Sequence, residues 1–381
     1  MKKTLLSIIT VIVVIVFFTL FTKGQKYTGT LDDDIEGDIS ISITDSIRLI
    51  FAGDAMGHSP QIKGAWRDGG DSCYNYIPNF QYVKDYISSA DIAVANLEVT
   101  LAGKPYTGYP EFSSPVSLAV ALKDAGFDLL LLANNHILDR GIQGLERTVN
   151  VLDSLEITHT GSFIDSIQWK NNYPLIMEKN GFRIAFLNYT YNTNITKAKS
   201  SIIVNYIDTI QIAADLAKAN EMNADYIIAL VHWGEEYKNV ENQKQCQIAD
   251  FLAQHGCNLV VGAHPHVVQP IKKMAGNESD SVLVAYSLGN FISNQRWRYS
   301  DGGIMLEVTL IKTDSIVKID NYHYEPVWVY RYLQKGVQLY RLIPVNDYLS
   351  NPEFYPALNI EDNKKLLQFY NDTKKIIIHN L

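Results

Sequence analysis

The sequence has 381 residues, of which 47% are hydrophobic and 19% charged, and its formal net charge is −8. This composition is typical of a globular chain with a large core in one or two domains, and the lack of a basic block argues against nucleic acid as a partner. Three cysteines exclude a disulfide scaffold, and the sequence has neither a Gly-x-Ser-x-Gly motif nor a P-loop, which argues against a serine hydrolase or an NTPase.

The N-terminal segment is predicted to anchor the chain in a membrane. Lys2 and Lys3 precede a mostly apolar run, residues 5–21, that contains no charge. Its length is close to the ~20 residues that a membrane-spanning helix needs. Because no clear small-residue cleavage site follows, we expect residues 1–22 to be an uncleaved single-pass anchor and the main domain to lie outside the cytoplasm. A cleaved signal peptide is the alternative, and residues 23–46 are predicted to be a solvated acidic linker.

From residue 47 the chain alternates between apolar runs and amphipathic runs. The apolar runs predict strands over residues 47–52, 91–95, 127–133, 157–161, 225–231, 258–261 and 282–286. The amphipathic runs predict helices over residues 78–90, 116–125, 143–155, 206–223 and 243–255. Alternation of this kind indicates an α/β fold.

Antiparallel strands are predicted in addition. Asn180-Gly181 predicts a hairpin between residues 173–179 and 182–189, and residues 303–311 and 315–324 resemble a second antiparallel pair. A C-terminal helix is expected over residues 362–381, docked by a small set of side chains. These side chains are Leu366, Leu367, Phe369 and Tyr370. We therefore expect a globular domain over residues 47–325 and a C-terminal extension over residues 326–381.

Polar side chains follow the ends of five predicted strands, which is where ligands bind in α/β sheets. They are Asp54 and His58, Asn96 and Glu98, Asn135 and His136, His232, and His264 and His266. Without a cation, crowding would leave such groups without hydrogen-bond partners, and each buried group of this kind costs roughly 1–3 kcal/mol of stability. Mixed nitrogen and oxygen ligands predict one or two divalent ions of the Zn, Mn or Fe class. The alternatives are a helix cap for Asp54 and a surface loop for the histidine pair.

A site of this composition supports hydrolysis. Two ions about 4 Å apart can clamp a phosphoryl or carbonyl group and activate a water, while a further histidine protonates the leaving group. Asp139 is either a cap or the carboxylate that orients His136. Trp233 is interpreted as pocket wall or core, and Asn290 as part of a substrate loop or of a turn.

Taken in order, the motifs resemble those of the CapA family, which is associated with poly-γ-glutamate capsule synthesis and export in bacteria. The motifs are Gly53-Asp54, Asn96-Leu97-Glu98, Ala133-Asn134-Asn135-His136 with Asp139 and Gly141, His232-Trp233-Gly234, Gly262-Ala263-His264-Pro265-His266 and Ser287-Leu288-Gly289-Asn290-Phe291. The resemblance runs from about residue 47 to residue 291. It implies a metallophosphatase-like α/β sandwich with added antiparallel strands, behind an N-terminal transmembrane helix.

The CapA family in turn is similar to the calcineurin-like metallophosphoesterases, and this similarity implies roles for single residues. It places Asp54 and His266 at a first metal, Asn135, His232 and His264 at a second, and Glu98 between the two. His58 lies four residues after Asp54, where that pattern has a histidine two residues after, and we include it as a metal ligand. His136 with Asp139 matches the pair that assists the leaving group. Substrate contacts are expected from Asn96, Asn134, Trp233 and Asn290.

The resemblance implies a membrane-anchored, extracytoplasmic, metal-dependent hydrolase or transferase that acts on an anionic polymer such as poly-γ-glutamate. Its expected partners are the cell membrane, the polymer, and the membrane subunits of a polymer synthase or exporter. One alternative is a non-enzymatic accessory subunit of such a synthase or exporter that holds polymer in the same cleft. A general phosphatase is a third hypothesis.

Overall fold

The computed structural model describes residues 44–195, 201–277 and 281–378 of the chain. The predicted anchor, residues 1–22, and most of the predicted linker, residues 23–46, lie outside the described residues. Across the described ranges, no helix combines the length and the apolar character that a membrane crossing requires.

The larger sheet holds the first strands of the α/β pattern. In the described residues it has eight strands in the order β16-β15-β14-β1-β2-β3-β4, with β13 beside β1. Their bounds are β1 (Thr44–Ala55), β2 (Ile92–Leu97), β3 (Leu129–Leu131), β4 (Thr158–Thr160), β13 (Asn290–Ile292), β14 (Gly302–Thr313), β15 (Ile316–Gln334) and β16 (Val337–Pro344). Strands β1 to β4 run parallel, and β14 to β16 continue the sheet in antiparallel fashion.

The second sheet has the order β11-β12-β10-β9-β7-β6, again counted over the described residues. Its strands are β6 (Leu175–Lys179), β7 (Phe182–Thr190), β9 (Tyr226–His232), β10 (Leu259–Ala263), β11 (Ile271–Ala275) and β12 (Ser281–Ala285). Strands β7, β9, β10 and β12 are parallel, and the antiparallel β6 and β11 form the two edges. The short strands β5 (Ser162–Phe163) and β8 (Ile203–Val204) pair with each other.

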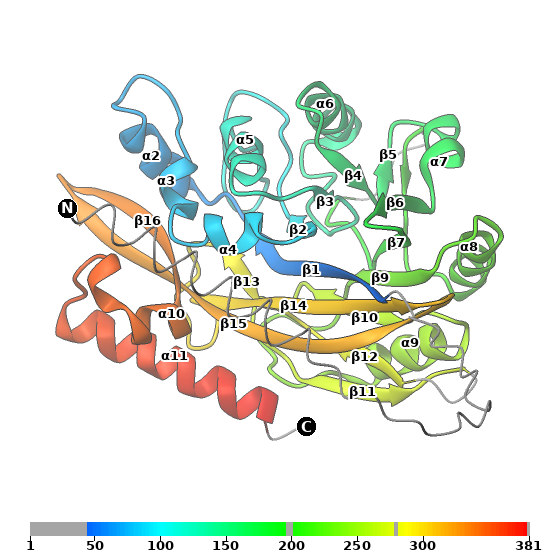
Figure 1. The fold of residues 1–381 in the computed structure, drawn as a ribbon. Coiled ribbons are helices and arrows are strands. Elements are labelled where there is room, and N and C mark those ends of the chain that lie inside the picture. Colours follow the sequence, from blue (N-terminus) through cyan, green and yellow to red (C-terminus); the bar gives the residue numbers. More distant parts are fainter. Residues whose placement is uncertain (1–43, 196–200, 278–280, 379–381) are drawn as a thin grey trace, which may run out of the picture. The chain divides into compact units, whose positions relative to one another are not determined.

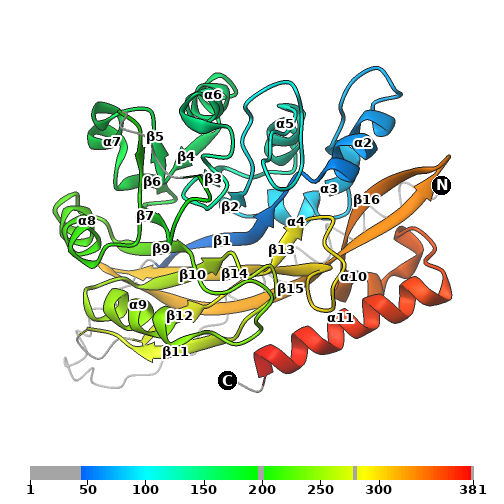
Figure 2. The same ribbon diagram turned by 180° about the vertical axis from the view of Figure 1, so that it is seen from behind.

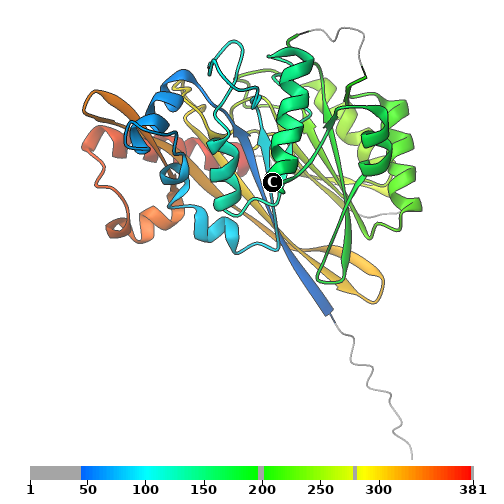
Figure 3. The same cartoon turned by 90° about the horizontal axis from the view of Figure 1, so that it is seen from above.

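The two sheets face each other, and helices cover their outer faces (Figures 1 and 2). Over the larger sheet lie α2 (Ser59–Asp68), α3 (Ile77–Phe80), α4 (Lys84–Ser88), α5 (Ser117–Asp124) and α6 (Gly141–Ser154), seen from above in Figure 3. Over the second sheet lie α7 (Ser166–Asn172), α8 (Thr209–Glu221) and α9 (Gln243–Gln254). The result is a four-layered fold, and its mixed α/β class is the one that the strand and helix alternation predicts.

Strand β1 illustrates why both faces of the sheet are buried. Ile47, Leu49 and Phe51 point into the core between the sheets, whereas Ile50 and Ala52 point into the core under the helices. Side chains alternate along a strand, so a strand with apolar residues on both faces must be covered on both. This places the strand ends, rather than the sheet faces, at the surface where a ligand can bind.

The C-terminal part of the chain belongs to the same sheet. Strand β15 crosses the predicted boundary after residue 325, and β16 pairs with it along its length. Beyond them, α10 (Val345–Ser350), the 3-10 helix η2 (Pro352–Phe354) and α11 (Ile360–Ile378) follow, and α10 and α11 pack against β15. Leu366 and Phe369 are buried in this contact as expected, but Leu367 is 42% exposed, so its predicted docking role is wrong.

The predicted helix over residues 78–90 is wrong in extent. The chain instead forms α3 and α4, separated by a turn in which the Val83 N–H donates to the Phe80 carbonyl at 3.0 Å. The apolar positions Phe80, Val83 and Ile87 are nevertheless all buried against the sheet. Their spacing of three and four residues is compatible with consecutive short turns as well as with one continuous helix.

Glu325 gives the fold a pH-dependent stability. Its side chain is 8% exposed and accepts hydrogen bonds from the backbone N–H and the amide of Asn346, at 2.8 and 2.9 Å. Burial outweighs these bonds and raises the pKa of Glu325 from 4.5 to about 7. The unfolded chain therefore loses this proton near pH 4.5, whereas the folded protein keeps it up to about pH 7, so stability falls as pH rises through this window.

We expect Glu325→Gln to flatten this slope, because glutamine has no proton to lose. Between pH 4.5 and pH 7.5 the free energy of unfolding of the wild type should fall by about 3 kcal/mol more than that of the variant. Chemical denaturation at both pH values measures the difference. The exposed Glu353→Gln is the control, and an unchanged slope in Glu325→Gln would show that the carboxyl is ionised in the fold.

Candidate metal centre

The ends of the parallel strands bring the predicted polar residues together. Asp54 near the end of β1 pairs in register with Asn96 of β2, and Glu98 follows directly after β2. In the second sheet, His232 is the last residue of β9 and pairs with Ala263 at the end of β10. Because these strands end at the same edge, side chains more than 200 residues apart in sequence meet there.

The turn after β10 has an unusual backbone. His264 and His266 have φ angles of 98° and 58°, in the left-handed region that side chains rarely adopt. Gly262 precedes them, and a Cβ at this position would lie 2.0 Å from the Tyr286 carbonyl oxygen. Strained backbone of this kind persists where the surroundings hold it, and it is concentrated at functional sites. Here it carries the two imidazoles of the turn to the cluster.

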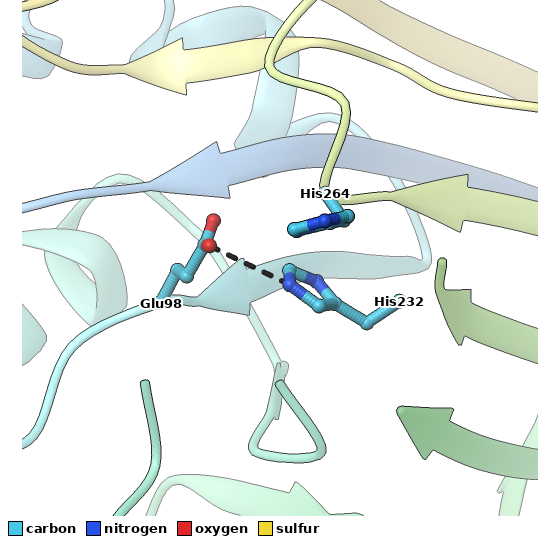
Figure 4. Close-up of side chains that lie close together, drawn as sticks. All are labelled: Glu98, His232 and His264. Atoms are coloured by element: carbon cyan, nitrogen blue, oxygen red, sulfur yellow. Dashed lines mark ion pairs between the residues drawn. The ribbon is translucent and has the colours of Figure 1, made fainter. Parts of the chain in front are cut away.

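Glu98 lies at the middle of the cluster and belongs to two groups of potential ligands. One group is Glu98, His232 and His264, and the other is Glu98, Asp54 and His266; within each, the ligand atoms lie within 4.8 Å of one another. Figure 4 shows the first group, with the three side chains pointing toward one another. Glu98 Oε1 is 3.5 Å from His232 Nε2 and 3.9 Å from His266 Nε2.

The polar atoms at the middle of the cluster lack partners. Both carboxylate oxygens of Glu98 and Nδ1 of His264 are buried, and none has a hydrogen bond within the described part of the chain. A buried polar group without a partner costs roughly 1–3 kcal/mol, and an unpaired charge costs more. Carboxylate and imidazole are the ligands that divalent transition metals prefer. The residues present therefore fit two cations that share Glu98.

The electrostatics of the cluster agree with this fit. Burial, and then the nearby Asp54 charge, raise the pKa of Glu98 well above its ordinary value. Burial also lowers the pKa of His232 well below normal and that of His264 to about 3, with smaller contributions from neighbouring histidines. These two imidazoles are thus neutral and can act as ligands. Without a cation, the ionised form of Glu98 has no adequate stabilisation.

Asp54 orients one of the histidines. Burial alone would raise the pKa of Asp54, but the hydrogen bond and the charge of His266 outweigh burial and hold the pKa of Asp54 below its usual value. The Nδ1 atom of His266 lies 3.0 Å from Asp54 Oδ2, which also accepts the His264 N–H at 3.3 Å. With the His266 proton on Nδ1, the lone pair of Nε2 is directed to the side of Glu98. A carboxylate that fixes the tautomer in this way is common around metal ligands.

Asn135 and His136 follow β3 and lie at the same edge. The side-chain oxygen of Asn135 is 2.9 Å from His232 Nε2, within reach of the first ligand group. His136 Nδ1 lies 2.7 Å from Asp139 Oδ2, which also accepts the Phe112 N–H at 2.8 Å. Asp139 thus orients the His136 ring rather than capping a helix. Its contact is with Nδ1 of His136 and does not involve Nε2.

Five predicted site residues are held in protein contacts instead. His58 lies outside both ligand groups of the described residues; it precedes α2, with Nδ1 3.1 Å from Gln61 Oε1. The gap of four residues after Asp54 carries His58 from β1 to the position before the helix, and its role as a metal ligand stays a prediction. The other four are at most 2% exposed and were expected to contact substrate, namely Asn96, Asn134, Trp233 and Asn290.

The contacts of these four residues support the cluster. Asn96 donates to Asp54 Oδ1 at 2.8 Å, and Asn134 donates to the Leu97 carbonyl at 2.9 Å. Asn290 donates to the His266 carbonyl at 3.2 Å. The indole N–H of Trp233 donates to the Tyr286 carbonyl at 2.9 Å, within the core under α8 and α9. These bonds give the three amides a positioning role and Trp233 a place in the core, and contact of the four residues with substrate stays a prediction.

Some residues around the centre carry no sequence signal. The ring of Tyr191 lies 4.6 Å from that of His264, and the edge of Phe112 packs on His136 at 4.7 Å. The side-chain nitrogen of Asn194 lies 3.2 Å from Nδ1 of His136. Each comes from a loop whose conformation is set by distant parts of the chain, so neither periodicity nor motif spacing indicates its place.

The comparison with protein families decides the identity. Residues 48–295 match the model of the family described as "Bacterial capsule synthesis protein PGA_cap". The chain belongs to this family. It is 28% identical to the PGA biosynthesis protein CapA of Bacillus subtilis (strain 168) over 278 residues, which cover 70% of this chain and 69% of the relative. With the capsule biosynthesis protein CapA of Bacillus anthracis, identity is 25% over 307 residues, covering 78% and 67%. The predicted resemblance to CapA is thus confirmed.

Solved structures with similar chains include phosphoesterases. The calcineurin-like phosphoesterase YfkN from Bacillus subtilis aligns with a TM-score of 0.42 and 10% identity, over 87% of this chain and 99% of that chain. The 5'-nucleotidase from Candida albicans SC5314 aligns with a TM-score of 0.44 and 11% identity, over 86% and 58%. TM-scores below 0.5 do not establish a common fold, so the ligand geometry above stands on its own contacts.

Proposed function

We propose that this capsule synthesis protein is a metal-dependent hydrolase or transferase that acts on an anionic surface polymer, with poly-γ-glutamate as its first candidate substrate. The observation that carries the proposal is Glu98, a buried carboxylate without a hydrogen bond that belongs to two ligand groups. The names of the Bacillus relatives, which refer to PGA and capsule biosynthesis, support the choice of polymer.

The chain's own residues have separable roles in this reaction. Asp54 and His266 with Glu98 would hold one divalent cation of the Zn, Mn or Fe class, and His232 and His264 with Glu98 would hold the other. Cations in these places would polarise a carbonyl or phosphoryl group and lower the pKa of water. Asn135, beside His232, is placed to complete the ligand group of Glu98, His232 and His264.

His136 is proposed to move the proton. Asp139 keeps the ring oriented and accepts its Nδ1–H, so a proton carried on Nε2 can be given to the leaving group. The ring is buried against Phe112, which limits its rotation and the access of bulk water. Such an arrangement serves an amide or an ester leaving group equally, and the polymer therefore decides which bond breaks.

The cellular setting is part of the proposal. Residues 1–22 would anchor the chain, and the four-layered domain would then meet polymer outside the cytoplasm, beside the membrane subunits that make or export it. An accessory role without catalysis is the competing proposal, and it is favoured by the relatives' names, which state biosynthesis and no hydrolytic activity.

Turnover of the polymer tests the proposal. The full chain in detergent, loaded with Zn²⁺ or Mn²⁺, is expected to release new amino termini from poly-γ-glutamate, to stop after chelation and to recover when metal returns. His232→Ala should abolish release, whereas His255→Ala, at an exposed histidine after α9, should not. Polymer binding without metal and without release would favour the accessory role. Cleavage of small phosphate esters alone would favour a phosphatase.

A further inference from the structure

A pocket of about 840 Å³ adjoins the metal centre. Tyr237 connects the two, because its ring lies 6.0 Å from that of His266 and 4.9 Å from that of Trp297. Tyr109 and Trp297 add exposed aromatic surface to the walls, and Glu236 adds one negative charge on the Tyr237 side. The volume lies within the range of small-molecule sites, so the pocket can take one segment of a chain substrate.

Two arginines line this pocket without any acidic partner. Arg296 comes from the loop between β13 and β14, and Arg331 from β15. Within the described ranges, neither guanidinium has a carboxylate oxygen within 4.0 Å. Burial, and then the charge of Arg331, lower the pKa of Arg296 to about 10, so Arg296 stays charged at neutral pH. Two like charges in one pocket favour the binding of an anion.

The free edge of Arg296 is the one that suits a carboxylate. Its Nη1 donates to the Val329 carbonyl at 2.9 Å, while Nε and Nη2 are buried without a hydrogen bond among the described residues. These two N–H groups point in parallel, which matches the two oxygens of a carboxylate.

The neighbouring Arg298 shows this geometry within the same loop. Its Nε and Nη2 each donate to a carboxylate oxygen of Asp372, both at 2.9 Å. Arg341, on the strand next to Arg331, forms a similar double contact with Asp68, at 2.9 and 3.0 Å. Arg298 and Arg341 are thus paired with carboxylates of the chain, whereas Arg296 and Arg331 are not. Arg331 has only a long contact, 3.4 Å, to Asn294.

We propose that Arg296 and Arg331 form a carboxylate-binding subsite that holds a free carboxylate of the polymer while the adjacent bond lies at the metal centre. This subsite rests on the proposed function and names the part of the substrate that it recognises. Aromatic side chains of the walls pack on the methylene groups between carboxylates. Since the net charge of the chain is −8, such local cations are needed to attract a polyanion.

Binding of γ-linked glutamate oligomers to the full chain in detergent tests the subsite. Arg331→Gln and Arg296→Gln should each weaken binding about tenfold or more and reduce its salt dependence, with metal content unchanged. Arg298→Gln is the matched control and should bind as the wild type does. Because Arg296 is largely buried, the exposed Arg331 keeps the test valid if Arg296→Gln folds poorly.

The outcomes separate the subsite from the proposed function. Wild-type affinity in Arg331→Gln, with turnover intact, would overturn the subsite and leave the hydrolase standing. If the wild type holds no metal and cleaves nothing, but Arg331→Gln loses binding of the oligomer, the subsite is supported and the hydrolase is overturned. Methyl-esterified oligomers should bind weakly and equally to all variants. Polyphosphate that binds more tightly than the glutamate oligomer, with the same dependence on Arg331, would overturn the assignment to carboxylate.

Discussion

Replacing Glu98 with glutamine is expected to empty both cation positions at once. Glu98 is the residue common to the two ligand groups, and its oxygens have no other hydrogen-bond partner in the described chain. Outer contacts of metal ligands change affinity by about 10- to 100-fold, so loss of a shared direct ligand should exceed about 100-fold. Elemental analysis after gentle purification should find two metals in the wild type and close to none in Glu98→Gln, with polymer turnover lost.

Stability of the metal-free proteins separates a ligand from a structural residue. Burial raises the pKa of Glu98 well above normal, so ionising Glu98 in the metal-free protein is unfavourable. Glutamine does not ionise and removes this free-energy cost. Metal-free Glu98→Gln should therefore unfold at a temperature at least as high as metal-free wild type at pH 8. The exposed Glu178→Gln serves as the control. Two metals retained in Glu98→Gln would refute the shared-ligand role.

Replacing His136 with alanine is expected to lower kcat by about 10²- to 10⁴-fold while both metals remain bound. His136 belongs to neither ligand group, and its Nδ1 is held by Asp139 at 2.7 Å. Asp139→Asn should lower kcat less and leave KM and metal content unchanged, because asparagine keeps the shape but orients the ring less firmly. Steady-state kinetics with elemental analysis on the same samples measures both effects.

A substrate with an activated leaving group sharpens this test. If His136 supplies a proton to the leaving group, the loss in His136→Ala should shrink when the leaving group needs no proton. His159→Ala is the control for loss of an imidazole, because His159 pairs with Asp153 and belongs to neither ligand group. Equal losses on both substrates, or loss of metal from His136→Ala, would contradict the proton-transfer role.

Much of the site could be predicted because buried parallel strands have a clear pattern. Apolar runs place strand ends within a few residues, and parallel strands that end at one edge bring Asp54, Glu98 and His232 together. The same reasoning does not place His58, which stands four residues after Asp54 at the N-cap of a helix. Sequence spacing describes positions along one strand and does not describe where the chain turns after it.

The partners of the amide side chains, and the places of residues from distant loops, could not be predicted in this way. Asn96, Asn134 and Asn290 have donors and acceptors that suit substrate and backbone equally, and only the tertiary structure shows that they bond to the chain. Arg296 and Arg331 lie 35 positions apart on different elements, and no motif relates them. The α/β class followed from alternation, whereas the division into α3 and α4 depended on local turns that periodicity does not resolve.

Anomalous diffraction from crystals of the metal-loaded protein tests the central claim most directly. Two peaks are predicted, both in contact with Glu98, one beside His232 and His264 and the other beside Asp54 and His266. A single peak, or peaks that do not touch Glu98, would contradict the two-cation centre and the hydrolytic function built on it.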